Sequence, residues 1–574
     1  MAQQQTIIDF AVPARMRDGV TLVADVYRPA HPGRYPALLS RTPYNRQSPT
    51  AAIGQLDVSR AVKAGYAVVI QDVRGRWDSE GDFYPFANEI DDGYDSVEWV
   101  AAQDWCDGRV GMFGASYVGA TQWLAATAGA PHLRTIMPTV TGSNYHENWT
   151  YQGGAFNLGF NLSWTLNQLQ TEALSRNRSR LPYFGSLWEA NFNALDDLCE
   201  QFAHLPLHEV PAVVRPNLIR YYFDWLKHPN DDEYWHQWCI EDNYSRIDTP
   251  SFNIGGWYDI FLGGTLRNYT ETRRLASDQR VRNGTRLIVG PWVHNAVDNG
   301  VGEYDFGIRS QWYKFDVDRI RLRWLDRWLK DEPKGPDEEP PVQIFVMGLN
   351  RWRDEDDWPP ADIDYVPYYL HQSGGLSPEK PGADEPPDAY LYDPRDPVPT
   401  RGGGLCCYPT GLPPGPFDQR EIEARPDVLV YSTPPLDRDI EVTGPVEVKL
   451  WAASSAPDTD FTAKLVDVEP DGFARNLTDG IIRARYRDSK SDPELIEPGR
   501  VYEYTIDLWA TSNLFKAGHQ IRLEISSSNF PRFDRNPNTG SQPGSNARLE
   551  PAMQRIFHDS RYPSHVLLPV LERG

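Results

Sequence analysis

Three side chains of this 574-residue chain have the chemistry needed to activate a serine hydroxyl. Ser116 follows an apolar run that begins at residue 110 and precedes a helical pattern, so it lies at a sharp turn between a strand and a helix. Asp259 and His294 each follow a later apolar segment. A serine hydroxyl is a poor nucleophile at neutral pH unless a base lies within hydrogen-bond reach and a third group orients that base. A serine, a histidine and an aspartate together could meet this requirement.

The positions of these residues favour a single site. Each follows a predicted strand, and the loops at the carboxyl ends of parallel strands converge at one edge of a sheet. The chain order Ser116, Asp259, His294 is the order found in α/β-hydrolases. Alone, Ser116 or Asp259 could simply cap a helix. Their joint occurrence predicts a catalytic triad with Ser116 as nucleophile, His294 as base and Asp259 as the group that orients it.

An oxyanion hole requires two hydrogen-bond donors aimed at the developing negative charge. The backbone N–H of Tyr117, the residue after the predicted nucleophile, is one candidate. The second donor is expected from the loop after an early strand, where Pro43 and Tyr44 lie. The Tyr44 phenol can donate from its side chain, although the same residue could merely pack against Pro43.

The elements around these residues alternate between buried strands and helices. Residues 17–19 (Arg-Asp-Gly) predict a hairpin turn, and residues 65–71 form a continuous apolar run typical of a strand buried on both faces. This alternation predicts a parallel α/β sheet. The predicted strands are 6–12, 20–27, 35–40, 65–71, 110–115, 133–140, 251–256 and 286–290, and the predicted helices are 88–103, 120–126 and 311–330.

Composition divides the chain into further parts. Aromatic residues recur at roughly helical spacing between residues 143 and 241, which predicts a helical insertion with its own core. Beyond an acidic, proline-rich linker at 331–341, short alternating runs, the first at 342–347, predict an all-β sandwich or jelly roll. The predicted fold is an α/β-hydrolase domain with a helical cap and a C-terminal jelly roll. The boundaries are 1–142 and 242–341 for the hydrolase domain, 143–241 for the cap and 342–574 for the jelly roll.

The charge balance limits the classes of partner. Net charge is −23 without a basic cluster, which argues against nucleic acid and anionic membrane surfaces. No apolar stretch approaches the ~20 residues needed to span a bilayer, and the N-terminus lacks a secretory leader pattern, so a cytoplasmic protein is expected. No disulfide framework, metal site or cofactor is expected from the scattered cysteines. They are Cys106, Cys199, Cys239, Cys406 and Cys407.

Several motifs together resemble the cocaine esterase/X-Pro dipeptidyl-peptidase family of serine hydrolases, and the resemblance extends over nearly the whole chain. It implies the triad, the oxyanion roles of Tyr44 and the Tyr117 amide, and an aromatic acyl pocket. The residues that match this pocket are Gln55, Trp149, Trp164, Phe261 and Leu405. The motifs are Arg17-Asp18-Gly19, Asp72-x-Arg74-Gly75, Gly114-x-Ser116-Tyr117-x-Gly119, Gly256-Trp257-Tyr258-Asp259 and Gly290-Pro291-Trp292-x-His294, with residues 458–468 and 526–531 in the β region.

One departure from the family bears on the substrate. The α-amino ester hydrolase branch has a carboxylate cluster after the catalytic aspartate, whereas Ile260, Phe261 and Leu262 follow Asp259 here. A buried substrate ammonium would lack a partner beside these residues. We therefore expect a small-molecule ester with a bulky or aromatic, benzoyl-like acyl group as substrate. One alternative is an amidase or peptidase of the same family, which would release X-Pro dipeptides or remove a β-lactam side chain. The other is a non-catalytic carbohydrate- or ligand-binding protein. A homodimer is left open.

Overall fold

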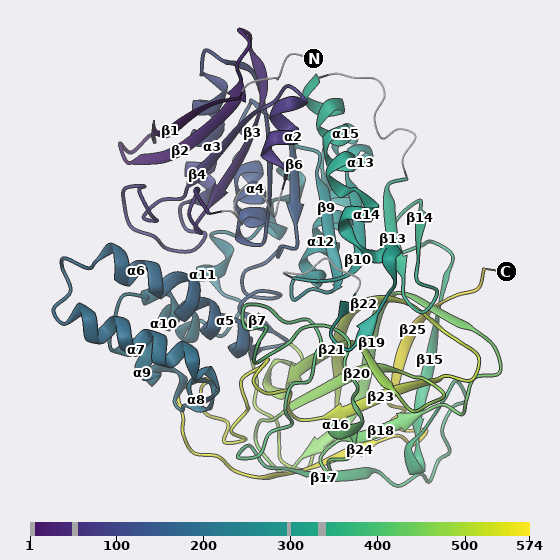
Figure 1. Ribbon diagram of the computed structural model, residues 1–574. Coiled ribbons are helices and arrows are strands. Elements are labelled where there is room, and N and C mark those ends of the chain that lie inside the picture. Colours follow the sequence, from purple (N-terminus) through teal and green to yellow (C-terminus); the bar gives the residue numbers. More distant parts are fainter. Residues whose placement is uncertain (1–5, 49–55, 295–299, 331–339, 574) are drawn as a thin grey trace.

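The computed structural model describes residues 6–48, 56–294, 300–330 and 340–573. Figure 1 shows three parts: a mixed α/β sheet with its helices, a group of cap helices at one end of that sheet, and a C-terminal all-β domain beside both. The predicted combination of a hydrolase sheet, a helical insertion and an all-β region is therefore confirmed.

The sheet of the hydrolase domain has ten strands within the described residues. The strands from β4 to β13 in spatial order run parallel, and antiparallel pairs extend the sheet at both edges. The hairpin predicted at residues 17–19 joins β1 to β2. In spatial order the strands are β1 (Thr6–Arg15), β2 (Thr21–Pro29), β4 (Ala67–Asp72), β3 (Tyr35–Thr42), β5 (Cys106–Ala115), β6 (Leu133–Thr139), β9 (Phe252–Tyr258), β10 (Arg286–Val293), β13 (Val342–Val346) and β14 (Arg351–Glu355).

Helices cover both faces of this sheet because its central strands are apolar on both sides. Leu38 of β3 packs with α2 and α15 on one face, whereas its neighbour Leu39 packs with α3 and α4 on the other. The helices are α2 (Val58–Lys63), α3 (Glu89–Ala101), α4 (Tyr117–Thr127), α12 (Leu262–Leu275), α13 (Gln279–Gly284), α14 (Trp312–Phe315) and α15 (Val317–Lys330).

The strand predicted at 342–347 belongs to a different part of the molecule from the one expected. We assigned it to the jelly roll, but β13 pairs in parallel with β10, and β14 then pairs with β13. Val342, Ile344 and Phe345 are fully buried. An apolar strand that follows the linker can add to the open edge of the hydrolase sheet, so composition alone misplaces it.

The helix predicted at 311–330 is interrupted. Asp316 adopts a left-handed backbone (φ 49°) between α14 and α15. Its carboxylate accepts from the Arg60 guanidinium of α2 at 2.9 Å and from the Arg319 N–H at 3.2 Å. One tertiary and one local hydrogen bond to the Asp316 carboxylate thus favour a break in an otherwise continuous apolar periodicity.

The cap is helical, as predicted, and is inserted between β6 and β9. Trp149, Trp164, Trp225 and Trp235 are buried in its core, whereas Phe192 of its outer helix is 42% exposed. The elements are β7 (Tyr151–Gln152), β8 (Ala155–Phe156), α5 (Leu158–Trp164), a π-helical segment η1 (Thr165–Gln170), α6 (Thr171–Arg176), α7 (Phe184–Asp196), α8 (Leu198–Ala203), η2 (Leu207–Glu209), α9 (Pro211–Val214), α10 (Arg220–Lys227), α11 (Glu233–His236) and η3 (Glu241–Arg246).

The C-terminal domain is built almost entirely from strands, and its neighbouring strands pair antiparallel apart from β16 and β18. Alternate residues of β19 and β22 point into a common apolar core. The strands are β15 (Ile363–His371), β16 (Gly375–Ser377), β17 (Asp388–Tyr392), β18 (Leu429–Ser432), β19 (Ile440–Ser454), β20 (Asp460–Val468), β21 (Ala474–Arg483), β22 (Tyr502–Phe515), β23 (Gln520–Ser526), β24 (Ala552–Phe557) and β25 (His565–Leu571).

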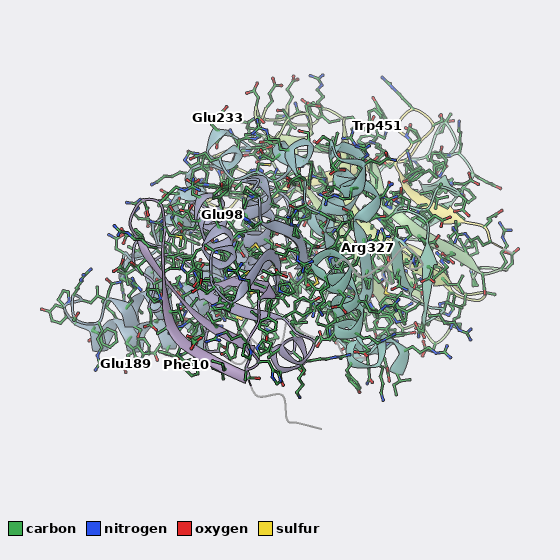
Figure 2. The ribbon with its side chains drawn as sticks, turned by 90° about the horizontal axis from the view of Figure 1, so that it is seen from above. Phe10, Glu98, Glu189, Glu233, Arg327 and Trp451 are labelled. Carbon is green, nitrogen blue, oxygen red and sulfur yellow. A yellow bond between two sulfur atoms is a disulfide. The ribbon has the colours of Figure 1, made fainter. Side chains whose placement is uncertain are left out.

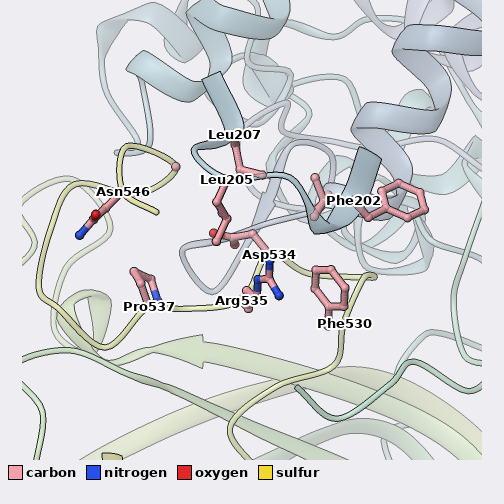
Figure 3. Close-up of a pocket in the computed structure, with 10 residues that line it drawn as sticks. Phe202, Leu205, Leu207, Phe530, Asp534, Arg535, Pro537 and Asn546 are labelled. Carbon is pink, nitrogen blue, oxygen red and sulfur yellow. The ribbon is translucent and has the colours of Figure 1, made fainter. Parts of the chain in front are cut away.

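The cap and the C-terminal domain are joined by both apolar and polar contacts. Figure 3 shows Leu205 and Leu207 of the cap facing Pro537 and neighbouring residues of the β domain across a small pocket. The backbones also bond directly, since the Arg483 N–H donates to the Gly153 carbonyl at 2.8 Å. These contacts hold the cap against the C-terminal domain.

Several charged residues of the cap lie on its outer surface, as Glu189 and Glu233 show in Figure 2, although Glu147 and Glu172 are buried. This distribution supports solvation as the role of the acidic excess. Among the described residues, every helix is too short or too polar to cross a bilayer.

The cap–β-domain contact generates a stability prediction. Gly153 has φ +54°, and an added Cβ would lie 2.0 Å from the Ile481 carbonyl oxygen. We expect Gly153→Ala to lower the free energy of unfolding by about 2–5 kcal/mol. Gly185→Ala is the matched control, because that exposed helical position has open space, and it should change stability by less than about 1 kcal/mol. Equal unfolding midpoints for the two variants would contradict the packing argument.

Candidate active site

Ser116 occupies the turn between β5 and α4 with an unusual backbone conformation. Its φ of 61° and ψ of −125° lie outside the regions that side-chain-bearing residues favour, at a cost of about 1–3 kcal/mol. The turn is held because the Ser116 N–H donates to the Thr139 carbonyl at 2.9 Å and the Thr141 hydroxyl donates to the Ser116 carbonyl at 2.9 Å. This geometry lifts the hydroxyl above the edge of the sheet, as in a nucleophile elbow.

Gly119, the displaced second glycine of the motif, has a packing role. A Cβ at this position would lie 2.8 Å from the Thr141 Cβ and 3.2 Å from the Thr139 carbonyl oxygen. Only a glycine therefore allows the first turn of α4 to pack this closely on the end of β6. The same approach brings Thr141 within reach of the Ser116 carbonyl.

The three predicted triad residues form a continuous hydrogen-bonded chain. The His294 Nε2 lies 3.0 Å from the Ser116 Oγ, and its Nδ1 lies 2.6 Å from the Asp259 Oδ1. The Asp259 side chain is fully buried, and that of His294 is 4% exposed. A carboxylate on Nδ1 fixes the proton there, so the lone pair of Nε2 faces the serine hydroxyl.

The glycine-rich motifs around Asp259 and His294 make room for Trp292. A Cβ on Gly256 would lie 2.3 Å from the Trp292 carbonyl oxygen, and a Cβ on Gly290 would overlap the Trp292 ring at the same distance. The Trp292 indole N–H donates to the Ser310 carbonyl at 2.6 Å. The parallel register of β9 and β10 shifts between Gly290 and Val293. This local distortion directs His294 back toward Asp259.

Tyr44 lies in the loop after β3, and its phenol faces Ser116. The Trp164 indole N–H donates to the Tyr44 hydroxyl at 3.1 Å, which leaves the phenolic proton free to be donated elsewhere. Burial raises the pKa of Tyr44 to about 12, although hydrogen bonds with Trp164 and Ser116 oppose this rise. The phenol is therefore a protonated donor across the neutral pH range.

A buried arginine, which the sequence analysis missed, anchors this loop. The Arg46 guanidinium contacts three carboxylates, at 2.9 Å for Asp25, 2.6 Å for Asp72 and 2.7 Å for Asp78. Asp72 also accepts from the Arg46 N–H at 2.7 Å. The motif that begins with Asp72 thus fixes the loop that carries Tyr44. The available sequence signal for this role was that Arg46 lies only two residues after Tyr44.

Tyr117 combines two separate contacts. Its side-chain hydroxyl is fixed, since it donates to the Glu89 carboxylate at 3.0 Å and accepts from the Phe86 N–H at 2.9 Å. Its backbone N–H begins α4, and no acceptor for it is found among the described residues. An unpaired N–H beside the Ser116 hydroxyl is suited to bind an oxyanion.

Aromatic rings from the cap and from the β9 loop form a wall beside the triad. Phe261 packs edge-on against the His294 ring at 5.2 Å and stacks on Trp149 at 4.2 Å. Trp149 meets Trp164 edge-to-face at 5.8 Å, and Phe160, which sequence reasoning missed, stacks on Trp164 at 5.6 Å. The structure thus brings three of the predicted pocket residues together.

The remaining predicted pocket residues are Leu405 and Gln55. Leu405 is buried in the same apolar core as Trp149 and Phe261, and the preceding Gly404 lies against the Asp259 backbone. A loop of the C-terminal domain therefore reaches the wall. Gln55 lies outside the described residues.

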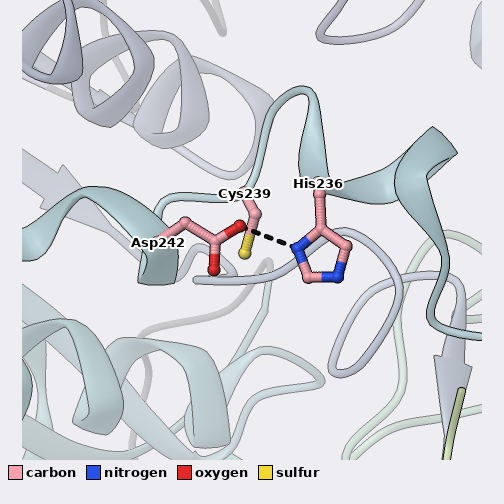
Figure 4. Close-up of side chains that lie close together, drawn as sticks. All are labelled: His236, Cys239 and Asp242. Atoms are coloured by element: carbon pink, nitrogen blue, oxygen red, sulfur yellow. Dashed lines mark hydrogen bonds and ion pairs between the residues drawn. The ribbon is translucent and has the colours of Figure 1, made fainter.

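A second group of polar side chains lies where the cap returns to the sheet. His236, Cys239 and Asp242 place their ligand atoms within 4.8 Å of one another, and Figure 4 shows them converging. The His236 Nδ1 and an Asp242 oxygen are 2.7 Å apart. Burial raises the pKa of the Cys239 thiol to about 12, so the thiol is protonated at neutral pH without a metal ion. His236 and Asp242 are exposed and pair with each other, whereas Cys239 is buried beneath them.

Comparisons with known proteins agree with this architecture. Residues 18–296 match the family model of the X-Pro dipeptidyl-peptidase (S15 family), and residues 334–567 match that of the X-Pro dipeptidyl-peptidase C-terminal non-catalytic domain. A cocaine esterase of Rhodococcus sp. (strain MB1 Bresler) is 40% identical over 571 residues, which cover 97% of each chain. The chain belongs to the cocaine esterase/X-Pro dipeptidyl-peptidase family of serine hydrolases. The family resemblance inferred from the motifs is confirmed.

Solved structures support the same fold over the whole chain. An α-amino acid ester hydrolase aligns with a TM-score of 0.84 and 25% identity, covering 99% of this chain and 97% of the other. An aminopeptidase from a marine sediment archaeon, Thaumarchaeota archaeon, aligns with a TM-score of 0.82 and 26% identity over the same shares. Proteins with this fold are therefore named both as ester hydrolases and as peptidases.

The close packing at Gly119 generates a prediction about the serine. We expect Gly119→Ala to push α4 away from β6 and to slow labelling of Ser116 by a fluorophosphonate roughly 10- to 100-fold. Gly93→Ala is the matched control, because its Cβ would meet Ala125 at 2.7 Å near the other end of the same helix. Both variants should unfold at lower temperature, but the control should label at the parental rate. Similar labelling rates in both variants would contradict a positioning role for Gly119.

Proposed function

We propose that this chain is a carboxylic-ester hydrolase that acts through an acyl-enzyme on Ser116. The observation that carries the proposal is the hydrogen-bond chain from Asp259 through His294 to Ser116, at 2.6 and 3.0 Å. The unpaired Tyr117 amide and the Tyr44 phenol supply two donors beside the nucleophile. Relatedness to a cocaine esterase at 40% identity supports the same reaction class.

In this mechanism Ser116 attacks the ester carbonyl carbon while its proton moves to the His294 Nε2. The tetrahedral intermediate carries a negative oxygen, which the Tyr44 hydroxyl and the Tyr117 N–H stabilise. When the bond to the alcohol oxygen breaks, His294 returns the proton to that oxygen and the acyl group remains on Ser116. A water molecule, deprotonated by His294, then attacks the acyl carbon, and the acid is released. Asp259 keeps the imidazole oriented in both steps.

The wall beside the triad favours a bulky or aromatic acyl group. Phe261 packs edge-on against His294, and Trp149 and Phe160 pack against Phe261 in turn. Trp164 contacts both of those rings, and Leu405 adds an aliphatic side chain to the same apolar core. Each aromatic contact adds about 0.5–1.5 kcal/mol beyond the burial of area. A benzoyl-like ester therefore suits this wall better than a short aliphatic one.

An amidase or peptidase of the same family is the second candidate. The aminopeptidase structure aligned at 26% identity favours it. A free amino terminus in the substrate requires a nearby carboxylate, yet the residues after Asp259 are apolar and buried. These are Ile260, Phe261 and Leu262. Because these residues offer no carboxylate to pair with an ammonium group, they support a neutral ester as substrate.

The nucleophile and the bond preference are tested together. We expect the parent protein to hydrolyse p-nitrophenyl benzoate at least about 100-fold faster, in kcat/KM, than the matched benzoyl p-nitroanilide, because amides are the less reactive acyl donors. Ser116→Ala should lower ester hydrolysis by about four orders of magnitude or more. A preference for the anilide would favour the amidase, and undiminished hydrolysis by the variant would exclude Ser116 as nucleophile.

The oxyanion role of Tyr44 is tested by Tyr44→Phe. Loss of the phenolic donor should lower kcat for p-nitrophenyl benzoate about 10²–10³-fold with little change in KM, because the contact strengthens only in the transition state. Tyr27→Phe is the control, because it removes the phenol of a tyrosine on β2 outside the site. This variant should retain kcat within about threefold. A change in KM alone would assign Tyr44 to substrate binding.

A further inference from the structure

The adjacent cysteines Cys406 and Cys407 are joined by a disulfide. The five cysteines are scattered along the chain, and their positions predicted no disulfide framework. The Cys406–Cys407 bond is an exception to that prediction. Cys406 is 5% exposed, whereas Cys407 is half-buried. The other three cysteines, which all lie within the described residues, are free thiols. A bond between neighbouring residues closes a small covalent ring, so it stiffens one loop rather than linking distant parts of the chain.

This loop, residues 404–412, lies between the hydrolase sheet and the cap. At its start, a Cβ on Gly404 would be 3.1 Å from the Asp259 carbonyl oxygen. At its end, the Leu412 side chain lies against Gly159 of α5, where an added Cβ would be 3.0 Å away. Between these points, the Tyr408 ring lies 6.2 Å from Phe202 of α8. The loop therefore contacts both the residue that orients the base and the helices of the cap.

The cysteines belong to the same apolar core as the rings of the aromatic wall. Cys406 and the preceding Leu405 are buried in one apolar core with Trp149, Trp164 and Phe261. Cys407 is partly buried and packs against the same core. A change in the shape of this loop would therefore change the surface that an acyl group meets.

The backbone of the loop depends on a constrained conformation. Cys407 has φ 73°, in the left-handed region that residues with a side chain rarely adopt. The base of the loop is clamped by reciprocal hydrogen bonds between Gly403 and Gly415, at 2.8 and 3.0 Å. Within the clamp, the disulfide ring restricts the torsions of Cys406 and Cys407. Opening the ring frees Cys407 to leave the left-handed region while the base of the loop stays in place.

We propose that the Cys406–Cys407 disulfide is a reversible thiol-modification site in the acyl-pocket wall, and that its redox state sets acyl selectivity. The closed ring holds Leu405 and Cys406 in the apolar core that contains Phe261. A dithiol reductant opens the ring, loosens this part of the wall and weakens discrimination in favour of bulky acyl groups. The effect on selectivity rests on the proposed ester-hydrolase function.

The chemistry balances with a dithiol as the only co-reactant. One thiolate of the reductant attacks the Cys407 sulfur, which is the more exposed of the two, and the Cys406 thiolate leaves and takes up a proton. The second reductant thiol then displaces Cys407 from the mixed disulfide. The pair has gained two electrons and two protons, and the reductant has become a cyclic disulfide. An oxidant of the disulfide class reverses both steps.

The experiment compares the full-length protein before and after treatment with dithiothreitol. Alkylation followed by mass spectrometry of the peptide that contains Cys406 and Cys407 reports the state of the ring. Selectivity is the ratio of kcat/KM for p-nitrophenyl benzoate to that for p-nitrophenyl acetate. We expect no alkylation of this peptide before reduction, two alkyl groups after it, and a fall of about tenfold in the ratio.

Two variants localise the effect. The double variant Cys406→Ser/Cys407→Ser should show the lowered ratio with or without the reductant. Cys199→Ser, which removes an exposed free thiol on α8, should respond to the reductant as the parent does. Two free thiols at Cys406 and Cys407 before reduction would overturn the proposal. An unchanged ratio after the ring has opened, or a response of the double variant to the reductant, would do the same.

The proposal and the ester-hydrolase function fail in distinguishable ways. If Ser116 is not the nucleophile, neither redox state hydrolyses esters through it and a fluorophosphonate leaves it unlabelled. The wall is then tested by calorimetric binding of benzoate, the acid that would occupy the pocket without reaction. A severalfold weaker Kd in the reduced protein supports the wall, and an identical Kd in the two states overturns it.

Discussion

The left-handed backbone of Ser116 is the constraint on which the rest of the site depends. A residue at φ 61° is unfavourable on its own, so the surrounding elements must hold it. Hydrogen bonds from Thr141 and to the Thr139 carbonyl fasten the turn to β6, and Gly119 allows α4 to approach closely enough for both. A sheet buried on both faces is rigid enough to carry this strain. The Ser116 hydroxyl is thereby held at the edge of the sheet by a rigid turn.

Each of the three parts of the molecule contributes to the site. The hydrolase sheet supplies Ser116, Asp259 and His294 from the ends of three strands. The cap supplies indole rings that lie over them, and the C-terminal domain sends the loop around Leu405 against the Asp259 backbone. Apolar walls exclude water and strengthen the electrostatic interactions between the catalytic groups. The inserted cap and the appended domain therefore complete a site that the sheet alone would leave open.

Much of this arrangement could be predicted from the sequence, because strand-end residues in a parallel sheet converge whatever the intervening loops do. Ser116 and His294 were identified in this way. The strand at 342–347 was misplaced because an apolar strand carries no signal for the sheet it joins. Arg46 was missed for a related reason, since its three carboxylate partners are separated along the chain and only the fold brings them together. The Trp164–Tyr44 hydrogen bond is also a product of tertiary structure.

That hydrogen bond limits how the active site can diverge. Trp164 belongs to the aromatic wall, yet its indole N–H also orients the Tyr44 phenol. Replacing Trp164 to reshape the wall would therefore also disturb the proposed oxyanion donor, whereas the Phe160 side chain makes ring contacts with the same wall. A substitution of Trp164 would change both the wall and the Tyr44 contact, whereas a substitution of Phe160 would change the wall alone. A change in the shape of the wall is therefore less constrained at Phe160 than at Trp164.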